Sequence, residues 1–208
     1  HNIVYSFDGP CPSERIIRIK VIRKANADFS MPAEICENEP SITLVPVSFT
    51  GTFSGPGIEP ANKFNPAKAG PGTHSIKYMI GGNCGDTVTK QIVVNPWFDA
   101  KIEPIAFVCS NQAAFELEAA SDGGVWQGTG ITNASNGTFN PALAGVGVHQ
   151  ITYNFSGKCP SGDTLQLEVK RKKNADFSLP SKACSRDEPI NLNPIETGGI
   201  WSGPGVDK

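Results

Sequence analysis

A sequence repeat of about 75 residues is the feature that most constrains how this chain can fold. The motif Gly51–Ile58 (GTFSGPGI) returns as Gly124–Ile131 (GVWQGTGI) and as Gly199–Val206 (GIWSGPGV). The same steps, 73 and then 75 residues, separate three further sets: His1, His74 and His149; Cys11, Cys84 and Cys159; and Cys36, Cys109 and Cys184. Self-similarity at one period is the signature of tandem structural repeats, so one repeat is the expected unit of folding.

The phase of the repeat predicts the domain boundaries. The motif Ala27–Ser30 (ADFS) recurs as Ala175–Ser178 and marks the start of a repeat. We therefore expect residues 26–96 and 97–172 to be complete repeats, 1–25 to be the C-terminal part of a repeat, and 173–208 to be the N-terminal half of another. Since a partial repeat is not expected to fold alone, the natural polypeptide is expected to continue in both directions.

Within a repeat, short segments rich in β-branched and aromatic residues alternate with Gly, Pro, Asn and Asp, which is typical of strands and turns. Strands are predicted at Ser41–Pro46, Thr52–Ser54, Thr73–Ile80 and Thr87–Val94, and the counterpart of the last is Thr164–Val169. Roughly seven short strands in about 75 residues fit a small sandwich. The predicted fold is all-β, a tandem array of immunoglobulin-like or PKD-like β-sandwich modules.

Alternation along one strand of each repeat identifies the side chains expected in the core. Every second residue is apolar there, which places one face on a core and the other in water. The residues predicted to point inward are Ile76, Tyr78 and Ile80, their counterparts Ile151, Tyr153 and Phe155, and the N-terminal set Ile3, Tyr5 and Phe7.

One aromatic residue per repeat occupies a constant place: Phe53, Trp126 and Trp201. Small sandwiches bury a central-strand ring at such a position, so core packing is the favoured interpretation. A sugar-stacking platform is the functional alternative. Trp97 is a further aromatic residue, but it is not repeated.

The six cysteines occupy two fixed places per repeat, which indicates disulfides in an oxidising compartment. Pairing within a repeat would join Cys36 to Cys84 and Cys109 to Cys159, closing loops of about 50 residues. Cys11 and Cys184 would then pair across repeats or outside this stretch of sequence.

A second pairing joins Cys36 of one complete repeat to Cys159 of the next. It is favoured by topology, because Cys36 and Cys84 are expected at opposite poles of one sandwich, about 25 Å apart. A disulfide needs Cα atoms within about 7 Å. Both schemes remain open at the level of sequence.

The sequence lacks the signals of several functional classes. The net charge of −2 gives no reason to expect nucleic acid as a partner, and no apolar run is long enough to cross a membrane. Nucleophile elbows, zinc-binding helices and phosphate-binding loops do not occur. The histidines come one per repeat, so they are expected to cap turns rather than to share a metal. We expect no enzyme activity, no cofactor and no metal site.

The run GxFSGPGI, FNPA and AGxGxH, followed by a hairpin that contains cysteine, resembles the tandem Ig-like and PKD-like repeats of giant Bacteroidota cell-surface adhesins, of which the SprB-type gliding adhesins are one kind. The resemblance covers the whole chain. It implies export by the type IX system and display at the extracellular cell surface. The partners it implies are neighbouring repeats of the same chain, cell-surface attachment machinery and surface glycans.

An Asp-Thr pair followed by an aliphatic residue stands at the start of the last predicted strand of both complete repeats, at Asp86-Thr87 and Asp163-Thr164. It resembles the O-glycosylation acceptor of Bacteroidota proteins, which makes Thr87 and Thr164 candidate glycosylation sites. The structural alternative is a turn that leads into a strand.

These observations predict a structural stalk segment of a surface-displayed adhesin filament that serves cell adhesion or gliding motility. One alternative is a set of weak glycan-binding modules combined by avidity. Another is an accessory array of a secreted polysaccharide-degrading enzyme.

Overall fold

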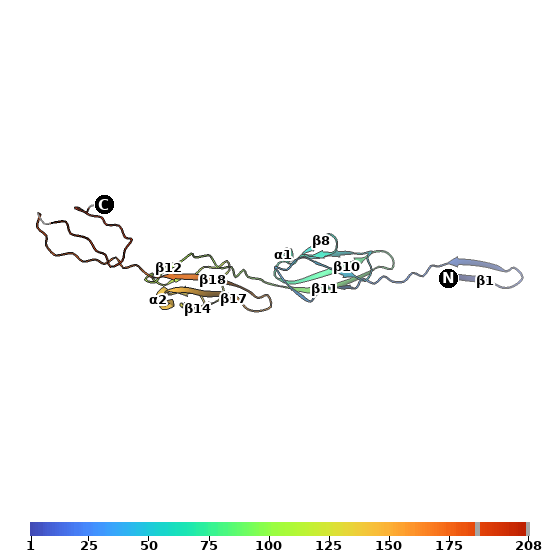
Figure 1. Cartoon of the computed structure of the whole chain (residues 1–208). Coiled ribbons are helices and arrows are strands. Elements are labelled where there is room, and N and C mark those ends of the chain that lie inside the picture. The colour runs from blue at the N-terminus through green and yellow to red at the C-terminus, as the bar shows by residue number, and fades with distance from the viewer. Residues whose placement is uncertain (186–187, 207–208) are drawn as a thin grey trace. The chain divides into compact units, whose positions relative to one another are not determined.

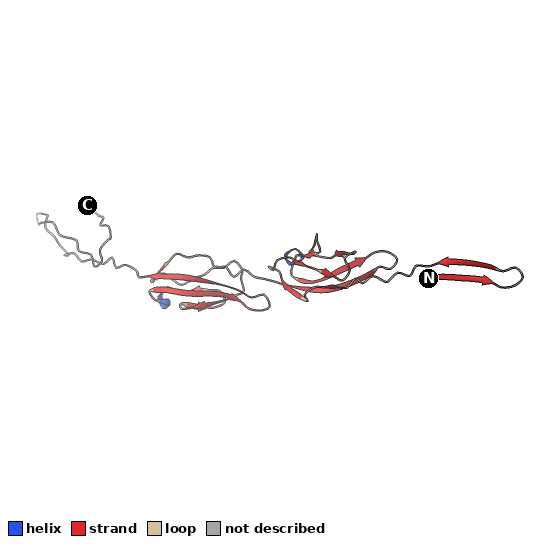
Figure 2. Cartoon of the chain, turned by 45° about the vertical axis from the view of Figure 1, so that its right-hand side comes forward, coloured by secondary structure: helices blue, strands red, loops and turns tan. Residues whose placement is uncertain are grey.

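The structure, a computed structural model, describes residues 1–185 and 188–206. Strands predominate in this part of the chain, and its two helices are single turns, α1 (Pro66–Ala69) and α2 (Pro141–Ala144) (Figure 2). The chain divides into two compact units. The first comprises His1–Phe98 with Ser156–Pro160, and the second comprises Asp99–Phe155 with Ser161–Lys208.

The first unit contains a β-sandwich built around the long hairpin of β10 and β11 (Figure 1). One layer is a four-stranded sheet in the order β4 (Glu34–Cys36), β11 (Asp86–Asn95), β10 (Gly72–Ile80) and β7 (Thr52–Ser54). The other strands form two small sheets, β3 (Phe29–Ser30) with β6 (Val45–Pro46), and β5 (Ile42–Thr43) with β9 (Lys63–Phe64) and β8 (Ile58–Glu59).

The core of this sandwich lies between the layers and confirms the inward face predicted for β10. Ile76, Tyr78 and Ile80 are buried, together with Ile92 and Val94 of β11. The opposite layer contributes three large buried side chains: Phe29 of β3, Phe64 of β9, and Leu44, which lies between β5 and β6.

The second unit repeats this plan. Its four-stranded sheet has the order β12 (Val108–Cys109), β18 (Ser161–Lys170), β17 (Gly147–Phe155) and β14 (Val125–Gly128). The facing sheet is β13 (Phe115–Glu116), β16 (Thr138–Phe139) and β15 (Ile131–Asn133). Ile151 and Tyr153 are buried as predicted, and Phe155 is half-buried against the same core.

The recurring FNPA motif folds as a capped helical turn. In the first repeat Asn65 is the N-cap, and its side chain accepts a hydrogen bond from Lys68 N at 3.2 Å, while Pro66 takes the first helical position. The His74 ring then donates from Nε2 to the Gly70 carbonyl at 2.7 Å. His149 and Gly145 form the same contact at 2.8 Å, so the histidines of the two complete repeats do cap the turn before their strands.

The first glycine of the GPGI motif, which is GTGI in the second repeat, is required by both conformation and space. Gly55 has φ 142° and Gly128 has φ 144°. A Cβ at Gly128 would lie 2.6 Å from the Gln150 carbonyl oxygen of β17. Only glycine adopts this conformation readily and lets two backbones approach so closely.

Replacing Gly128 with alanine is expected to destabilise the second unit by about 1–3 kcal/mol, because the change adds backbone strain and a clash with β17. Urea unfolding followed by tryptophan fluorescence measures this. Gly145→Ala, at another positive φ but with no atom within 4 Å of the added Cβ, separates strain from the clash. Equal losses in both variants would contradict the role of the close approach.

One strand prediction is wrong in detail. Ser41–Pro46 is not one strand, because Ile42–Thr43 pairs with β9 whereas Val45–Pro46 pairs with β3. The buried Leu44 lies between them, so the segment crosses from one small sheet to the other.

The N-terminal residues expected to point into a core are exposed. β1 (Asn2–Phe7) and β2 (Ser13–Arg18) form a two-stranded hairpin, in which Ile3, Tyr5 and Phe7 are all more than half exposed. These residues do lie in a strand, but no second layer covers this hairpin in the described structure.

Candidate functional site

The hairpin turns that carry the cysteines form the candidate functional site. Residues 81–85 connect β10 to β11, and residues 156–160 connect β17 to β18. Cys84 and Cys159 lie in these turns. The second turn belongs by sequence to the second complete repeat, yet it forms part of the first compact unit.

This turn is bonded covalently to the first repeat. Cys36 and Cys159 form a disulfide with a Cα–Cα distance of 5.7 Å. Cys36 ends strand β4, which pairs in parallel with the end of β11 and places Cys36 opposite Asn95. Cys159 is buried, and its sulfur lies 3.9 Å from the Asn95 carbonyl oxygen. The link therefore sits where the last strand of the first repeat ends.

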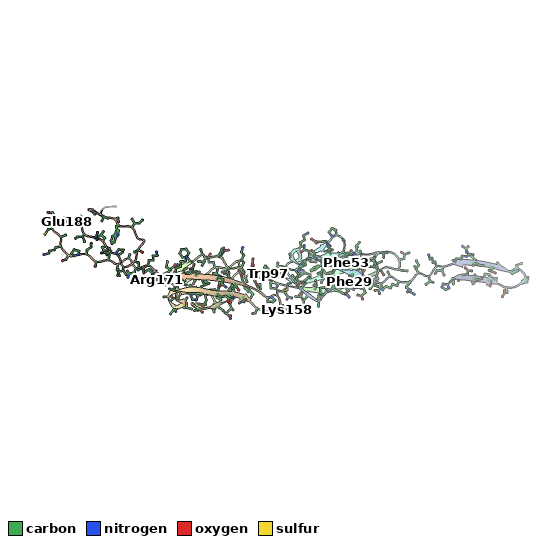
Figure 3. The ribbon with its side chains drawn as sticks, in the orientation of Figure 1. Phe29, Phe53, Trp97, Lys158, Arg171 and Glu188 are labelled. Carbon is green, nitrogen blue, oxygen red and sulfur yellow. A yellow bond between two sulfur atoms is a disulfide. The ribbon has the colours of Figure 1, made fainter. Side chains whose placement is uncertain are left out.

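An ion pair lies beside the disulfide. Lys158 (Figure 3), whose neighbour in sequence is Cys159, bonds to the Glu34 carboxylate. This carboxylate also accepts a hydrogen bond from the Asn95 side chain at 3.4 Å. The Lys158 ammonium, and after it the Asn95 amide, hold the pKa of the Glu34 carboxyl below its ordinary value. Both partners are about half exposed or more, so the pair orients the turn more than it stabilises it.

Of the two disulfide schemes, the structure has the one that links consecutive repeats. The pairing within a repeat does not occur, because Cys36 and Cys84 lie at opposite ends of β11. That strand has ten residues and is therefore about 30 Å long, several times the span of a disulfide. Cys11, Cys84 and Cys109 form no disulfide in the structure.

The two recurring aspartates have a structural role that the sequence reading missed. Asp86 accepts a hydrogen bond from Ala27 N at 3.0 Å and pairs with Lys24 at 3.0 Å. Asp163 accepts from Ile102 N at 2.9 Å. Each carboxylate thus holds the segment where the chain enters its repeat. In the sequence, the signal for this role is that Asp recurs near the start of the last strand.

The two Asp-Thr pairs are not in the same register. Asp86 lies opposite Ile80, the last residue of β10, whereas Asp163 lies opposite Tyr153, two residues before the end of β17. Because a shift of two residues keeps the same face of a strand, both carboxylates still reach the entering segment. Thr87 and Thr164 are exposed, and their glycosylation stays a prediction.

Stability of the second unit is expected to fall at acid pH through Asp163. Hydrogen bonds from Ile102 N and then Thr164 N lower the pKa of this carboxyl. A pKa lower in the folded than in the unfolded state means stabilisation that is present above about pH 4 and lost as the pH falls through the folded value. Urea unfolding at pH 7 and pH 3 measures it. Asp163→Asn should flatten this part of the pH dependence, and an unchanged profile would contradict the assignment.

The recurring aromatic residues pack as core side chains in both complete repeats. Trp126 is 3% exposed and stacks on Tyr153, with ring centroids 4.3 Å apart. Phe53, which is half-buried, lies 4.3 Å from the Tyr78 ring and 5.1 Å edge-on from Phe29 (Figure 3). At 3% exposure, Trp126 offers no free face on which a sugar could stack.

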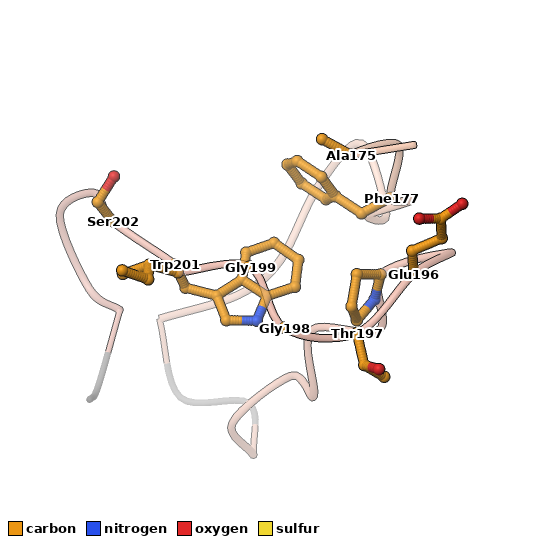
Figure 4. A pocket seen from close by; sticks show the side chains of 10 residues that line it. Ala175, Phe177, Glu196, Thr197, Gly198, Gly199, Trp201 and Ser202 are labelled. Carbon is orange, nitrogen blue, oxygen red and sulfur yellow. The ribbon is translucent and has the colours of Figure 1, made fainter. Parts of the chain in front are cut away.

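Trp201, the third member of this set, lies in a different environment. It is half-buried and meets Phe177 edge-on, with centroids 4.9 Å apart. The two rings line a hollow of about 500 Å³ that stays open between residues 175 and 202 (Figure 4).

Within residues 1–185 and 188–206, no group of three or more His, Cys, Asp or Glu side chains is placed to hold a metal ion. Over the same residues, no helix combines the length and the apolar character needed to cross a membrane.

No family model and no curated protein matches the chain. Solved structures similar to it include Drosophila N-cadherin EC1-4, with 17% identity, a TM-score of 0.39, and coverage of 72% of this chain and 50% of that one. Mouse clustered PcdhgC3 EC1-3 has 12% identity, a TM-score of 0.32, and coverage of 83% and 77%. A Bacteroides ovatus mixed-linkage glucan utilization locus protein, SGBP-B, solved with a mixed-linkage heptasaccharide, has 15% identity, a TM-score of 0.24, and coverage of 64% and 42%. The chain thus spans about half the length of the N-cadherin structure.

Proposed function

We propose that this chain is a structural stalk segment of an exported, surface-displayed repeat protein of the adhesin kind. The observation that carries the proposal is the Cys36–Cys159 disulfide, which bonds one repeat to the hairpin turn of the next. A protein whose task is to bear load gains from a covalent path that does not depend on the folding of each repeat.

The position of the disulfide defines that path. When the two ends of the chain are pulled apart, tension reaches Cys36, crosses the sulfur bridge, and leaves through Cys159. Residues 37–158, which include most of both complete sandwiches, lie outside the path. Their backbone ladders are therefore protected from extension as long as the disulfide is intact.

Single-molecule pulling of the 208-residue chain from its two ends tests this proposal. The two cysteines are 123 residues apart in sequence, so their reduction should add roughly 400 Å to the length released on unfolding. Cys109→Ser, which leaves the bridge intact, is the control and should behave like the parent chain. Equal extensions of the oxidised and reduced chains would refute the load path.

Display at the cell surface is the second part of the proposal and needs its own test. Antibodies raised against the chain should label intact cells of the source organism, and mild protease treatment of those cells should remove the label. Label found only after lysis would contradict surface display. In this proposal the chain is not an enzyme, its partners are neighbouring repeats and attachment machinery, and Thr87 and Thr164 carry glycans.

A role as a set of glycan-binding modules is less well supported. Binding by avidity needs a similar site in each repeat, and the aromatic residues that do recur, Phe53 and Trp126, pack against Tyr78 and Tyr153 in the cores.

A further inference from the structure

A pocket of about 530 Å³ lies on the second complete repeat. It is lined by β13, by residues 117–123, by β14, by the loop before β16 and by β17, all of which belong to the second unit. Sites for small ligands have volumes of about 300–1,000 Å³. The pocket is therefore large enough to take a small molecule or a side chain of a partner.

Three acidic side chains line this pocket, and no basic residue lines it in the described part of the chain: Glu116, Glu118 and Asp122. Glu116 accepts a hydrogen bond from the Asn136 side chain at 2.6 Å. Within residues 1–185 and 188–206, none of the three carboxylates forms an ion pair. The pocket thus carries three negative charges without a neutralising cation, which favours a positively charged ligand.

The pocket also contains a hydrogen-bond donor without a partner. Trp126 is 3% exposed, and no described residue accepts a hydrogen bond from its Nε1. Every fully buried side-chain nitrogen or oxygen of the described residues does have a partner, so solvent reaches this Nε1 through the pocket that Trp126 lines. Beside it lies Gly137, where an added Cβ would be only 2.7 Å from Nε1. The absence of a side chain at Gly137 therefore keeps the N–H uncovered.

The first complete repeat shows that the fold does not need these polar groups. There the pairing of Ile42 with Phe64 matches that of Phe115 with Phe139, and the Tyr78 hydroxyl bonds to Ser48 O and Gly51 N as Tyr153 bonds to Ser121 O and Gly124 N. The counterparts of the three acidic residues and of the tryptophan are all uncharged: Thr43, Val45, Phe49 and Phe53.

The loop that brings Ser135 and Asn136 to the pocket also differs between the repeats. It is two residues longer than the loop between Ile58 and Phe64 in the first repeat. The same scaffold thus carries a polar, acidic pocket in one repeat only, so a role in binding explains these residues better than a role in folding.

We propose that this pocket binds an arginine side chain of a partner polypeptide. The three carboxylates are not placed to hold a metal ion together, so the positive charge of the ligand must be spread over several atoms. A guanidinium group meets this need, because it is planar, weakly hydrated and carries five N–H donors that pair with carboxylates. A neutral sugar would cover the carboxylates without neutralising them, which costs free energy.

The indole N–H accounts for the rest of the ligand. A guanidinium has no hydrogen-bond acceptor, so it cannot satisfy Trp126 Nε1. A main-chain carbonyl of the partner, a few bonds from the guanidinium, accepts from Nε1 while the arginine side chain pairs with Glu118 and Asp122. The faces of the Trp126 ring stay in the core, and only its Nε1 edge takes part in binding.

Nuclear magnetic resonance of the ¹⁵N-labelled 208-residue chain, titrated with the peptide acetyl-Gly-Arg-Gly-amide, tests the proposal. We expect the indole N–H signal of Trp126 to shift and saturate at millimolar peptide or below. Trp97 and Trp201 lie outside the pocket, so their signals are internal references. The variant Trp126→Phe, which copies Phe53, assigns the signal by its loss. An indole signal that does not move with the peptide would overturn the proposal.

Charge variants separate the pocket from general attraction. Glu118 and Asp122 are exposed, so Glu118→Gln and Asp122→Asn should fold normally, and each should weaken peptide binding about tenfold. Glu168→Gln removes the same charge from β18, outside the pocket, and is the matched control that should bind like the parent chain. Equal weakening in all three variants would overturn the site, since it would mean that only the net charge attracts the peptide.

Other ligands complete the test. Acetyl-Gly-Leu-Gly-amide should leave the Trp126 signal unmoved, because it lacks the guanidinium. Cellobiose or calcium chloride that shifts this signal at lower concentration than the arginine peptide would overturn the proposal in favour of a glycan or a metal site. The site is independent of the stalk role, because none of its residues belongs to the Cys36–Cys159 link. Loss of peptide binding would therefore leave the extensions of the oxidised and reduced chains unchanged.

Discussion

Replacing Cys159 with serine is expected to lower the free energy of unfolding of the first unit by about 4–5 kcal/mol. The disulfide closes a loop that spans a sequence separation of 123 residues. In the chain-entropy description, a cross-link across a loop of that size restricts the unfolded chain by about this amount. A small domain is stable by only about 5–15 kcal/mol, so the unit should become marginal.

Urea unfolding without reductant, followed by far-UV circular dichroism, measures the loss. Cys109→Ser is the matched control, because Cys109 is exposed and forms no disulfide in the structure, and its effect should stay within about 0.5 kcal/mol. Reductant should destabilise the parent chain and leave Cys159→Ser unchanged. Identical unfolding curves for Cys159→Ser and the parent chain would show that the bridge contributes nothing to stability.

The fold class could be predicted from the sequence because the same strand-type alternation, weak in any one segment, occurs in every repeat. Alternation in one eight-residue segment indicates a strand only loosely, but three copies with the same period identify a hairpin face. Ile76 and Tyr78 are buried for this reason, and so are Ile151 and Tyr153.

Features that depend on contacts between distant segments could not be predicted in the same way. The cysteine spacing is compatible with either disulfide scheme, and the choice follows from the ends of β11 at which Cys36 and Cys84 lie. The hydrogen bond from Ala27 N to Asp86 joins residues 59 positions apart. No local pattern in the sequence encodes which backbone N–H a carboxylate will meet.

The exposed N-terminal hairpin shows the limit of pattern reading. Alternation of apolar and polar residues indicates which face of a strand is apolar. Burial of that face also requires a second layer that packs against it, and the alternation does not show whether such a layer is present. Tyr5 and Tyr78 have the same local sequence signature, and their exposed fractions are 66% and 1%. The difference is the layer that Phe29 and Leu44 provide in the first repeat.

Replacing Trp126 with alanine is the second substitution with a large expected effect. The ring is 3% exposed and stacks on Tyr153 at 4.3 Å. Its removal leaves a cavity in the core of the second unit and deletes an aromatic pair, which typically costs about 3–5 kcal/mol in all. The Tyr153 hydroxyl donates to the Ser121 carbonyl at 2.8 Å and accepts from Gly124 N at 2.8 Å, and both bonds depend on the position of this ring.

Thermal and urea unfolding of Trp126→Ala measure the loss, and Trp201→Ala is the matched control at the same place in the repeat. Trp201 is only half-buried and lies outside the two complete sandwiches, so its removal should change the unfolding of the second unit by less than about 1 kcal/mol. Similar losses for the two variants would contradict the core role of Trp126. A loss below about 1 kcal/mol for Trp126→Ala would reopen the alternative in which this ring is kept for a ligand.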